Sequence, residues 1–534
     1  MSHPHVRFVF VTGGVISGLG KGIVASSLGM LLKSQGYKVT IQKFDPYFNL
    51  DPGTMNPYEH GEVFVTHDGG ETDLDLGHYE RFIDEELSRA NSVTSGMVMW
   101  DVLNRERKGD YLGNTVMVIP QVAGDIKQRI TKTLEQRPVD VVITEIGGTV
   151  GDIEAMWFLE AARQFQAEHR DRCVHIHVTL VPFLRMSGEF KTKPTQHSVK
   201  ALREAGVSAD IVVLRSEKPL GAAVKEKTSM LCSVPSVLEC VDAKSIYDVP
   251  LQLAREGLDE VVLKHLQLPT RQKNLTAWQG FVDTLHNPQL PTVTIALVGK
   301  YTALPDADLS VCEALKHAAA ENNAHVRVLP VNAEDLEKQD VQVVLAKVDG
   351  ILVPGGFGKR GIEGKIKAAK FAREKNVPYL GICLGMQIAA IEFGRNVLGL
   401  AQANSTEFDQ TTPDPIIDFL PDQRTLTKKG GTMRLGSYVC AIAAGSRLAK
   451  AYQAAQVSER HRHRYEFNNL YRDRFESEGM VFSGTSPDNA LVEAMELKSH
   501  PWFVGCQFHP EFKSRPCRPH PLFDGLIKAV LDRK

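Results

Sequence analysis

The chain lacks paired cysteines, long apolar runs and an excess of charge of either sign. Its eight cysteines are scattered over 534 residues with no CxxC pair, which argues against a structural zinc site or a disulfide-stabilised fold. No apolar run reaches the length of a membrane span, and the N-terminus has no basic region followed by a long apolar segment. The formal net charge is −2, so no general attraction to nucleic acid or to anionic membranes is expected. We therefore expect a cytoplasmic protein with no nucleic-acid or membrane partner, in which any phosphate site is local.

Short apolar runs alternate with helical patterns along the chain, which is too long for one hydrophobic core. Continuous apolar runs are typical of strands buried on both faces of a parallel sheet, and their alternation with helices predicts a doubly wound α/β fold. A stretch punctuated by Pro and Asn separates two such series. We predict a first domain over residues 1–266, a linker over 267–290 and a second α/β domain over 291–534. The predicted strands lie in 6–14, 37–45, 139–148, 174–182 and 209–216, and then in 292–301, 325–333, 349–358 and 377–385.

The first predicted strand runs into the glycine-rich segment TGGVISGLGKG (12–22), which a helical pattern follows. A glycine-rich turn before a helix aims backbone N–H groups and the helix N-terminus at phosphate. The Gly20-Lys21 pair fits a P-loop, but Val15 stands where its first glycine belongs and Gly22 replaces the Ser or Thr. The segment predicts nucleotide binding, with a simple turn of the sheet as the alternative. Any magnesium ion must find its protein ligands elsewhere.

Acidic residues supply candidate ligands for such an ion. Asp73 and Asp75 would share one face if GGETDLDLG (69–77) is extended, and Glu145 ends the predicted strand 139–148. Ligands bind at the carboxyl ends of strands in open α/β sheets. Asp75 and Glu145 together could hold a hard cation against phosphate oxygens, whereas each alone could equally be a solvated loop residue.

Lysines at a predicted helix N-terminus indicate a second anionic ligand. In GEFKTKPTQHSVK (188–200), Lys191 and Lys193 precede a proline and a helical pattern. The helix dipole repels cations at this end, so a bound anion would explain them. A solvated basic turn is the alternative. Lys43 and Asp45 add a charged pair at the end of the predicted strand 37–45.

Cys383 lies between Gly381 and Gly385, where a predicted strand meets a helix. Gly-x-nucleophile-x-Gly is the spacing of a nucleophile elbow, and a helix N-terminus favours the thiolate. A small buried cysteine in a tight turn is the alternative. The turn PGG (354–356) could present backbone N–H groups to an oxyanion, and QFHPEF (507–512) supplies His509 with Glu511 as its orienting carboxylate. These two segments favour the nucleophile.

The motifs PGGFG, GICLGMQ and QFHPEF together resemble those of class I, triad-type glutamine amidotransferase domains. They follow TGGVISGLGKG, DPYFNLDPGTMNPYEHGEVFVTHDGGETDLDLGHYERF, EIGGTVGDIE and GEFKTKPTQHS. In this order, and over essentially the full chain, they resemble the CTP synthase family. The resemblance implies a ligase that aminates UTP to CTP with ATP and with ammonia from glutamine, the last step of CTP synthesis.

The resemblance implies roles for residues of the C-terminal half. Cys383 would attack glutamine, His509 would act as general base and acid, and Glu511 would orient His509. The backbone N–H groups of Gly356 and Leu384 would form the oxyanion hole. The other glutamine-binding residues that it implies are Gly385, Met386, Gln387, Glu407 and Arg464.

In the N-terminal half the resemblance implies that ATP phosphorylates O4 of UTP and that ammonia then displaces the phosphate. The implied Mg²⁺ ligands are Asp75 and Glu145. The implied ATP-binding residues are Gly18, Leu19, Gly20, Lys21, Gly22, Ile23 and Asp75. The implied UTP- and CTP-binding residues are Ser17, Lys43, Asp152, Ile153, Glu154, Lys191, Thr192, Lys193, Pro194, Thr195, Gln196 and Lys227.

The resemblance also implies a homotetramer, with filament formation left open, activation by GTP and inhibition by the product CTP. The segment GFGKRGIEG (356–364) matches a loop implicated in GTP action, whereas the region before GTMRLG (431–436) has no clear counterpart of an expected arginine. The sequence of residues 409–431 predicts a loop or hairpin excursion.

Two other functions remain open. One is an amidotransferase fused to another ATP-dependent amidoligase, and the other is a structural or regulatory protein that has kept the fold.

Overall fold

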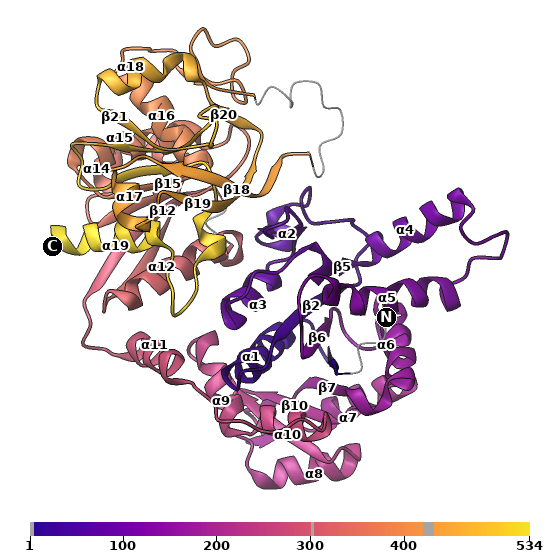
Figure 1. The fold of residues 1–534 in the computed structure, drawn as a ribbon. Helices are drawn as coiled ribbons and strands as arrows, with labels where there is room; N and C mark the ends of the chain where they lie inside the picture. The colour runs from indigo at the N-terminus through magenta and orange to yellow at the C-terminus, as the bar shows by residue number, and fades with distance from the viewer. Residues whose placement is uncertain (1–4, 301–303, 420–431) are drawn as a thin grey trace. The chain divides into compact units, whose positions relative to one another are not determined.

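The computed structural model describes residues 5–300, 304–419 and 432–534. Contacts divide the chain into two units, each formed from two stretches of sequence. Unit 1 comprises Met1–Pro52 and Asp75–Val282, and unit 2 comprises Gly53–Leu74 and Asp283–Lys534. The short stretch Gly53–Leu74 therefore leaves the N-terminal half and joins the C-terminal one, which the sequence analysis did not foresee. In Figure 1 the colour follows the residue number, so Gly53–Leu74 can be found by its indigo-to-violet colour.

Unit 1 is built on a seven-stranded sheet with the order β11-β10-β7-β1-β6-β2-β5. All its neighbouring strands are parallel, so the predicted doubly wound α/β fold is confirmed. The five strands predicted for the first half all exist. The sheet strands are β1 (Arg7–Gly13), β2 (Val39–Asp45), β5 (Ser92–Thr94), β6 (Val141–Ile146), β7 (Cys173–Leu180), β10 (Ile211–Ser216) and β11 (Ser236–Val241).

Helices cover both faces of this sheet (Figure 1). Phe8 and Phe10 of β1 share a core with α4 to α7, while the alternate residues Val9 and Val11 are buried on the other face. On that face α1 contacts α3, α9 and α10. The helices are α1 (Lys21–Ser34), α3 (Asp75–Ile83), α4 (Ser95–Lys108), α5 (Ala123–Lys132), α6 (Met156–Glu168), α7 (Lys193–Glu204), α8 (Ala222–Cys232), α9 (Val249–Arg255) and α10 (Leu258–His265); a small hairpin consists of β8 (Phe183–Leu184) and β9 (Glu189–Phe190). In the predicted linker lies α11 (Thr276–His286).

Unit 2 is built on a nine-stranded sheet with the order β13-β12-β14-β15-β23-β22-β21-β18-β19. The first five strands are parallel, and the other four continue the sheet in antiparallel fashion. The four strands predicted at the start of this half are present as β12 to β15. The strands are β12 (Thr292–Gly299), β13 (His325–Asn332), β14 (Gly350–Val353), β15 (Tyr379–Ile382), β18 (Arg434–Ile442), β19 (Gln456–His463), β21 (Met480–Thr485), β22 (Val492–Leu497) and β23 (Phe503–Cys506).

A smaller sheet completes unit 2, with β16 (Asn404–Ser405), β17 (Pro415–Phe419) and β20 (Tyr465–Phe467). The excursion predicted at 409–431 thus begins with β17, and residues 420–431 lie outside those described. The helices are α12 (Leu309–Glu321), α13 (Ala333–Lys338), α14 (Val341–Val344), α15 (Ile362–Lys375), α16 (Leu384–Asn396), α17 (Arg447–Tyr452), α18 (Arg472–Ser477) and α19 (Pro521–Arg533). No helix in the described ranges combines the length and apolar character that a membrane span requires.

The inserted stretch Gly53–Leu74 holds α2 (Pro57–His60) and a hairpin of β3 (Phe64–Val65) and β4 (Glu71–Thr72). Its apolar anchor is Phe64, which is 1% exposed and packs edge-on against Phe512 with ring centroids 4.9 Å apart. The Arg460 guanidinium donates to the carbonyl oxygen of Val65 at 3.0 Å. Apolar burial and hydrogen bonds to backbone therefore fix this hairpin on unit 2.

Candidate functional site

Cys383 occupies the turn between β15 and α16 in unit 2. Its backbone has φ 52° and ψ −103°, a strained conformation for a residue with a Cβ. The flanking glycines are needed for space. A Cβ at Gly381 would lie 2.5 Å from the carbonyl oxygen of Gly385, and a Cβ at Gly385 would collide with the carbonyl oxygen of Val353. The structure therefore places Cys383 on a tight strand-to-helix turn of the kind that the sequence predicts.

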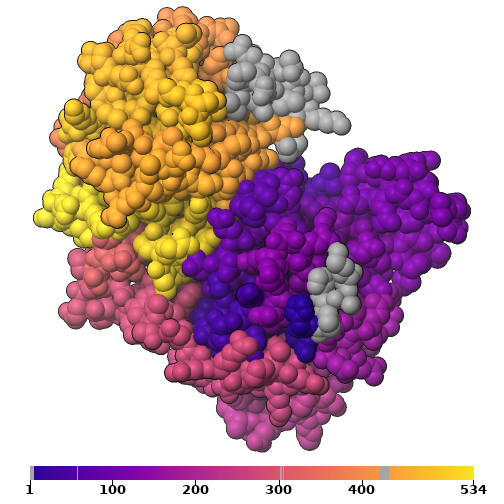
Figure 2. All heavy atoms as spheres, viewed as in Figure 1, coloured from indigo at the N-terminus to yellow at the C-terminus, as the bar shows by residue number. Residues whose placement is uncertain are grey.

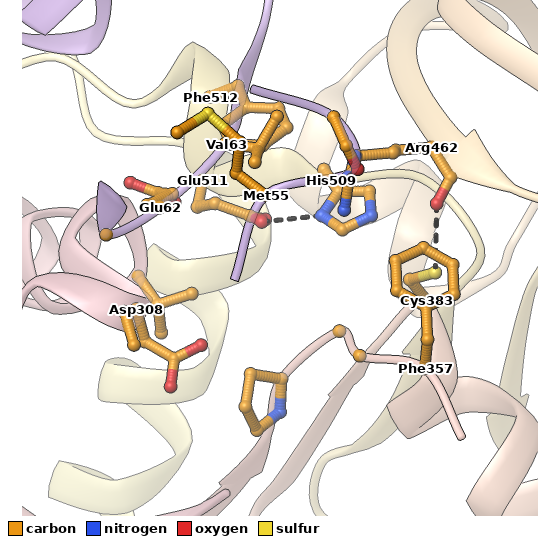
Figure 3. A pocket seen from close by; sticks show the side chains of 17 residues that line it. Met55, Glu62, Val63, Asp308, Phe357, Cys383, Arg462, His509, Glu511 and Phe512 are labelled. Atoms are coloured by element: carbon orange, nitrogen blue, oxygen red, sulfur yellow. Dashed lines mark hydrogen bonds and ion pairs between the residues drawn. The ribbon is translucent and has the colours of Figure 1, made fainter. Parts of the chain in front are cut away.

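His509 and Glu511 follow β23, the strand next to β15. The Nδ1 atom of His509 lies 2.7 Å from Oε1 of Glu511, and both side chains are buried. The Nε2 atom has no hydrogen-bond partner among the described residues. Burial lowers the pKa of His509, but the negative charges of Glu511 and Cys383 outweigh it and raise the pKa to about 10. The imidazole is therefore oriented by Glu511 and faces Cys383 with its other nitrogen (Figure 3).

Replacing Glu511 with glutamine is expected to lower the pKa of His509, because the variant removes the larger of the two opposing charges. In the wild type the raised pKa contributes stability that is full below about pH 6.5, the ordinary histidine value, and is lost as the pH rises to about 10. The melting temperature of the wild type should therefore exceed that of Glu511→Gln most near pH 6. Melting curves between about pH 6 and pH 10 measure this difference.

Glu476→Gln is the matched control, because Glu476 pairs with Arg472 at the surface at 3.4 Å. It should change the melting temperature little and equally at all pH values. If the difference in melting temperature between the wild type and Glu511→Gln stays constant up to about pH 10, Glu511 is not the group that raises the pKa of His509.

A pocket of about 200 Å³ opens over these side chains, and all its lining residues belong to unit 2. Its floor carries Cys383, His509 and Glu511. The inserted stretch supplies Gly53, Met55, Gly61, Glu62 and Val63, and the remaining lining residues are Ala307, Asp308, Val311, Pro354, Gly355, Gly356, Phe357, Arg462 and Phe512. A segment from the N-terminal half of the sequence thus forms part of the wall around the cysteine.

Arg462 connects this wall to the cysteine. Its carbonyl oxygen lies 3.7 Å from the sulfur of Cys383 and can accept the thiol hydrogen. Its guanidinium donates to Glu71 at 2.8 Å and to the carbonyl oxygen of Gly53 at 3.1 Å. The sequence analysis missed Arg462, because nothing in RHRHRYE distinguishes it from its neighbours.

The PGG turn packs directly against both reacting side chains. A Cβ at Gly355 would lie 2.8 Å from Cε1 of His509 and 3.7 Å from Cβ of Cys383. Behind the turn, Glu407 accepts a hydrogen bond from the backbone N–H of Gly358 at 2.6 Å. Gly356 and Leu384 are in contact range, since a Cβ at Gly356 would lie 3.5 Å from Cδ2 of Leu384. Both predicted oxyanion donors therefore belong to segments that border Cys383.

The predicted glutamine-binding side chains fall into two groups. Met386 and Gln387 are buried in the interior of the unit. Glu407 and Arg464 both lie near Tyr465, whose pKa is raised to about 12 by burial and by Glu407, with Arg464 opposing. Glu407 and Arg464 are therefore the charged members of the set and lie near the same tyrosine, and neither is among the residues that line the pocket over Cys383.

The glycine-rich segment of unit 1 connects β1 to α1, as predicted. Gly18 and Gly20 adopt φ 72° and 82°, values that only glycine takes without strain. Lys21 opens α1, and its Nζ donates to the carbonyl oxygen of Gly148 at 2.7 Å. Burial lowers the pKa of Lys21 and the Glu145 carboxylate opposes this effect. A buried cation and a free helix N-terminus thus lie at the same edge of the sheet.

Asp75 and Glu145 meet beside this helix N-terminus. The ammonium group of Lys43 pairs with both carboxylates, with Glu145 at 3.1 Å. A Cβ at Gly22 would lie 2.7 Å from Oδ1 of Asp75, so the Ser or Thr of a standard P-loop would displace this carboxylate. Buried with them is Asp45, whose pKa burial raises to about 7 against the effect of Lys43.

The expectation that Asp73 and Asp75 share one face of an extended segment is wrong. Asp75 begins α3 in unit 1, whereas Asp73 precedes it in unit 2 and pairs with His60 at 3.2 Å. In the described residues no group of three or more His, Cys, Asp or Glu is placed to hold a metal ion. Two carboxylates at a phosphate loop do fit a magnesium ion that takes its other ligands from phosphate and water.

The predicted pyrimidine-nucleotide residues lie on segments around the same sheet edge. The loop before Asp152 touches the phosphate loop, because the N–H of Val150 donates to the carbonyl oxygen of Gly13 at 2.9 Å. Asp152, Ile153 and Glu154 are exposed. Lys191 pairs with Glu189, and Lys191 together with Lys227 of α8 lowers the pKa of Glu189. Lys191, which precedes α7, and Lys227 of α8 therefore both lie near Glu189, and an anionic ligand at this place would meet both positive charges.

A second hollow of about 510 Å³ lies at the carboxyl ends of β10 and β11. Val241, Asp242, Ala243 and Lys244 line it, and the sequence analysis assigned nothing there. The apolar run SVLECV (236–241), which forms β11, could have indicated a further strand and therefore a sheet edge at this place. The carboxyl edge of such a sheet is where ligands bind.

Comparisons with known proteins match both halves of the chain. The family model described as CTP synthase N-terminus matches residues 7–268, and the class-I glutamine amidotransferase model matches residues 303–529. A CTP synthase of Carboxydothermus hydrogenoformans is 58% identical over 528 residues, 98% of each chain. The chain belongs to the CTP synthase family. Another CTP synthase, from Bacillus subtilis, is 54% identical over 529 residues, 98% of this chain and 99% of that one.

A solved structure of the glutaminase domain of Trypanosoma brucei CTPS with bound acivicin is 38% identical. It gives a TM-score of 0.43 and covers 45% of this chain and 94% of that chain. The two family models and the full-length CTP synthase relatives confirm the family resemblance drawn from the sequence. The roles of the individual residues remain predictions.

Proposed function

We propose that the chain converts UTP, ATP, glutamine and water into CTP, ADP, phosphate and glutamate. The observation that carries the proposal is that one chain holds both an elbow cysteine with a buried His–Glu pair and a phosphate loop beside paired carboxylates. The first set suits the release of ammonia from an amide, and the second suits phosphoryl transfer. Membership of the CTP synthase family supplies the link between the two reactions.

In unit 2 the thiolate of Cys383 attacks the side-chain amide carbon of glutamine. The oxyanion that develops accepts hydrogen bonds from the N–H groups of Gly356 and Leu384, and His509 gives its proton to the departing ammonia. The thioester is then hydrolysed by water, with neutral His509 accepting a proton and the thiolate leaving. Glu511 keeps Nε2 of His509 turned toward the sulfur, and Glu407 and Arg464 hold the charged end of the substrate.

In unit 1 ATP lies over Gly18 to Ile23, with its phosphates at the N-terminus of α1 and at Lys21. UTP binds near Ser17, Lys43, Asp152 to Glu154, Lys191 to Gln196 and Lys227. The γ-phosphoryl group moves to O4 of the uracil, which turns a poor leaving group into phosphate, and ammonia displaces it. Mg²⁺ bound with ATP at Asp75 and Glu145 would neutralise charge on the phosphate oxygens. Lys43 would then pair with phosphate as well as with these carboxylates.

The proposal includes a cytoplasmic homotetramer that GTP activates and CTP inhibits. α4 and the segment that follows it lie at one edge of unit 1 (Figures 1 and 2). Large apolar side chains are exposed there, Trp100 at 58%, Leu112 at 90% and Met117 at 60%, and self-association would cover them. CTP would compete at the UTP residues, and GTP would act through the loop 356–364.

Purified protein is expected to form CTP from UTP with ATP, magnesium and either glutamine or ammonium chloride. The change in absorbance from UTP to CTP follows the reaction directly. A different ATP-dependent amidoligase would release glutamate in the same mixture without forming CTP. If neither nitrogen source gives CTP, the proposed function fails.

A further inference from the structure

Gln507 has a side-chain N–H group within hydrogen-bond distance of the Cys383 sulfur, the reacting atom of the proposed glutaminase site. It is fully buried and lies between the end of β23 and His509. Its side-chain Nε2 is 3.5 Å from the sulfur of Cys383. This separation is within the range of an N–H···S hydrogen bond, since sulfur is larger than oxygen. The motif QFHPEF drew attention to His509 and Glu511, but glutamine is an ordinary residue at a strand end and gave no signal of its own.

The orientation of the Gln507 amide follows from its neighbours. Nε2 of Gln387 donates to the carbonyl oxygen of Tyr465 at 3.0 Å, and that oxygen can only accept. The same amide nitrogen donates to Oε1 of Gln507 at 3.1 Å. The oxygen of Gln507 is therefore turned toward Gln387, and its NH₂ group is turned toward Cys383. The hydrogen-bond pattern fixes both amides without reference to a substrate.

The surroundings of the sulfur complement each of its two protonation states. A thiol can donate its hydrogen to the carbonyl oxygen of Arg462 at 3.7 Å. A thiolate has no hydrogen to donate and needs donors instead, which Gln507 and a protonated His509 supply. Of these, His509 must release its proton to ammonia during the reaction, whereas an amide N–H does not titrate. Gln507 therefore still donates when the thiolate leaves the thioester and His509 is taking a proton from water.

We propose that Gln507 is a further catalytic residue of the glutaminase reaction, donating to the Cys383 thiolate, and that Gln387 is its positioning residue. This inference rests on the proposed function, in which Cys383 is the nucleophile, and adds a group that acts on that nucleophile. It also changes the expected role of Gln387. Its side-chain NH₂ group donates to both Tyr465 and Gln507, so this group holds the Gln507 amide in place.

The test measures the reaction of Cys383 with iodoacetamide as a function of pH, using the full-length protein and peptide mass spectrometry. Gln507→Leu removes the donor at similar volume, and the pH midpoint of alkylation at Cys383 should rise by about one to two units, as expected for a lost hydrogen bond to a charged group. Glutaminase kcat/KM at neutral pH should fall roughly 10- to 100-fold. Gln387→Leu should shift the midpoint in the same direction by less, because the donor remains but is no longer oriented.

Asn468→Leu is the matched control. It removes another amide of unit 2, which donates to the carbonyl oxygen of Pro415 at 2.9 Å, and it should leave the midpoint unchanged. Gln507→Asn tests the same contact if the leucine variant does not fold, since it keeps the amide but withdraws it from the sulfur. An unshifted midpoint in Gln507→Asn and Gln387→Leu would overturn the inference. Alkylation and glutamate release are measured without CTP formation. A shifted midpoint together with a lowered glutaminase kcat/KM in a protein that makes no CTP would therefore refute the proposed synthesis and leave this inference standing, whereas an unshifted midpoint would overturn the inference alone.

Discussion

Replacing Cys383 with alanine is expected to abolish CTP synthesis from glutamine while synthesis from ammonium chloride continues near the wild-type rate. Without the sulfur no thioester forms. Removing a catalytic nucleophile usually lowers the rate of the reaction at least about 10³-fold. Ammonia added to the medium bypasses unit 2, because its site of use is in unit 1. The alanine meets the same backbone strain at φ 52° that the cysteine does. Parallel assays with glutamine and with ammonium chloride measure the two rates of CTP formation.

Cys440→Ala controls for the loss of a buried cysteine. Cys440 is fully buried in the same hydrophobic core as Cys383 but lies on β18, away from the elbow. Both activities should persist in this variant. Equal loss of glutamine- and ammonium-dependent synthesis in Cys383→Ala would assign the cysteine to the fold, and retention of both would remove it from the mechanism.

Replacing Lys21 with alanine is expected to reduce CTP synthesis from either nitrogen source by at least about 10²-fold, the usual effect of removing one charge-stabilising donor. The lysine is 8% exposed, and its ammonium lies at the start of α1 where the phosphates of ATP would bind. Hydrolysis of glutamine should continue, because Lys21 belongs to unit 1 whereas Cys383, His509 and Glu511 belong to unit 2. Separate measurements of glutamate release and CTP formation test both statements.

Lys33→Ala is the control on the same helix. Lys33 lies in the last turn of α1 and pairs with Glu85 at 2.7 Å at the surface, so its loss should change neither activity appreciably. Synthesis in Lys21→Ala within about twofold of the wild type would contradict the proposed ATP site.

The strands could be predicted because each is a local apolar pattern, and the elbow because its local spacing agreed with two motifs elsewhere in the chain. Runs such as those at 6–14 and 377–385 are mainly apolar and short, and Gly-rich turns follow them, which is typical of strands buried on both faces. Gly381 and Gly385 indicated an elbow but left a small buried cysteine as the alternative, and the PGG turn together with the segment of His509 and Glu511 favoured the nucleophile. The sequence also shows that Gly22 stands where a P-loop has Ser or Thr, but it does not show the reason. The cause is the Asp75 carboxylate, which is 53 residues away and fills the space that a side chain would take.

The rest of the site depends on contacts that no local pattern records. Asp73 and Asp75 would share one face of an extended segment, but Asp75 begins a helix and the boundary between the two units falls between Leu74 and Asp75. Gln507 and Gln387 matter through the direction of their amides, which only the packed neighbours determine. Arg462 acts through its carbonyl on one side and its guanidinium on the other, and its partners Cys383, Glu71 and Gly53 come from three separate segments.

The hairpin carried by Gly53–Leu74 has a consequence for the order in which the chain is made. Val65 and Arg460, which hold it in place, are 395 residues apart. At roughly 5 to 20 residues per second, the hairpin leaves the ribosome about 20 to 80 s before the strand that binds it. During that interval Phe64 has no aromatic partner, and the first half of the chain must fold around a loop that it cannot itself bury. A nascent or truncated chain that ends before β19 therefore exposes this hairpin to chaperones, proteases and other nascent chains.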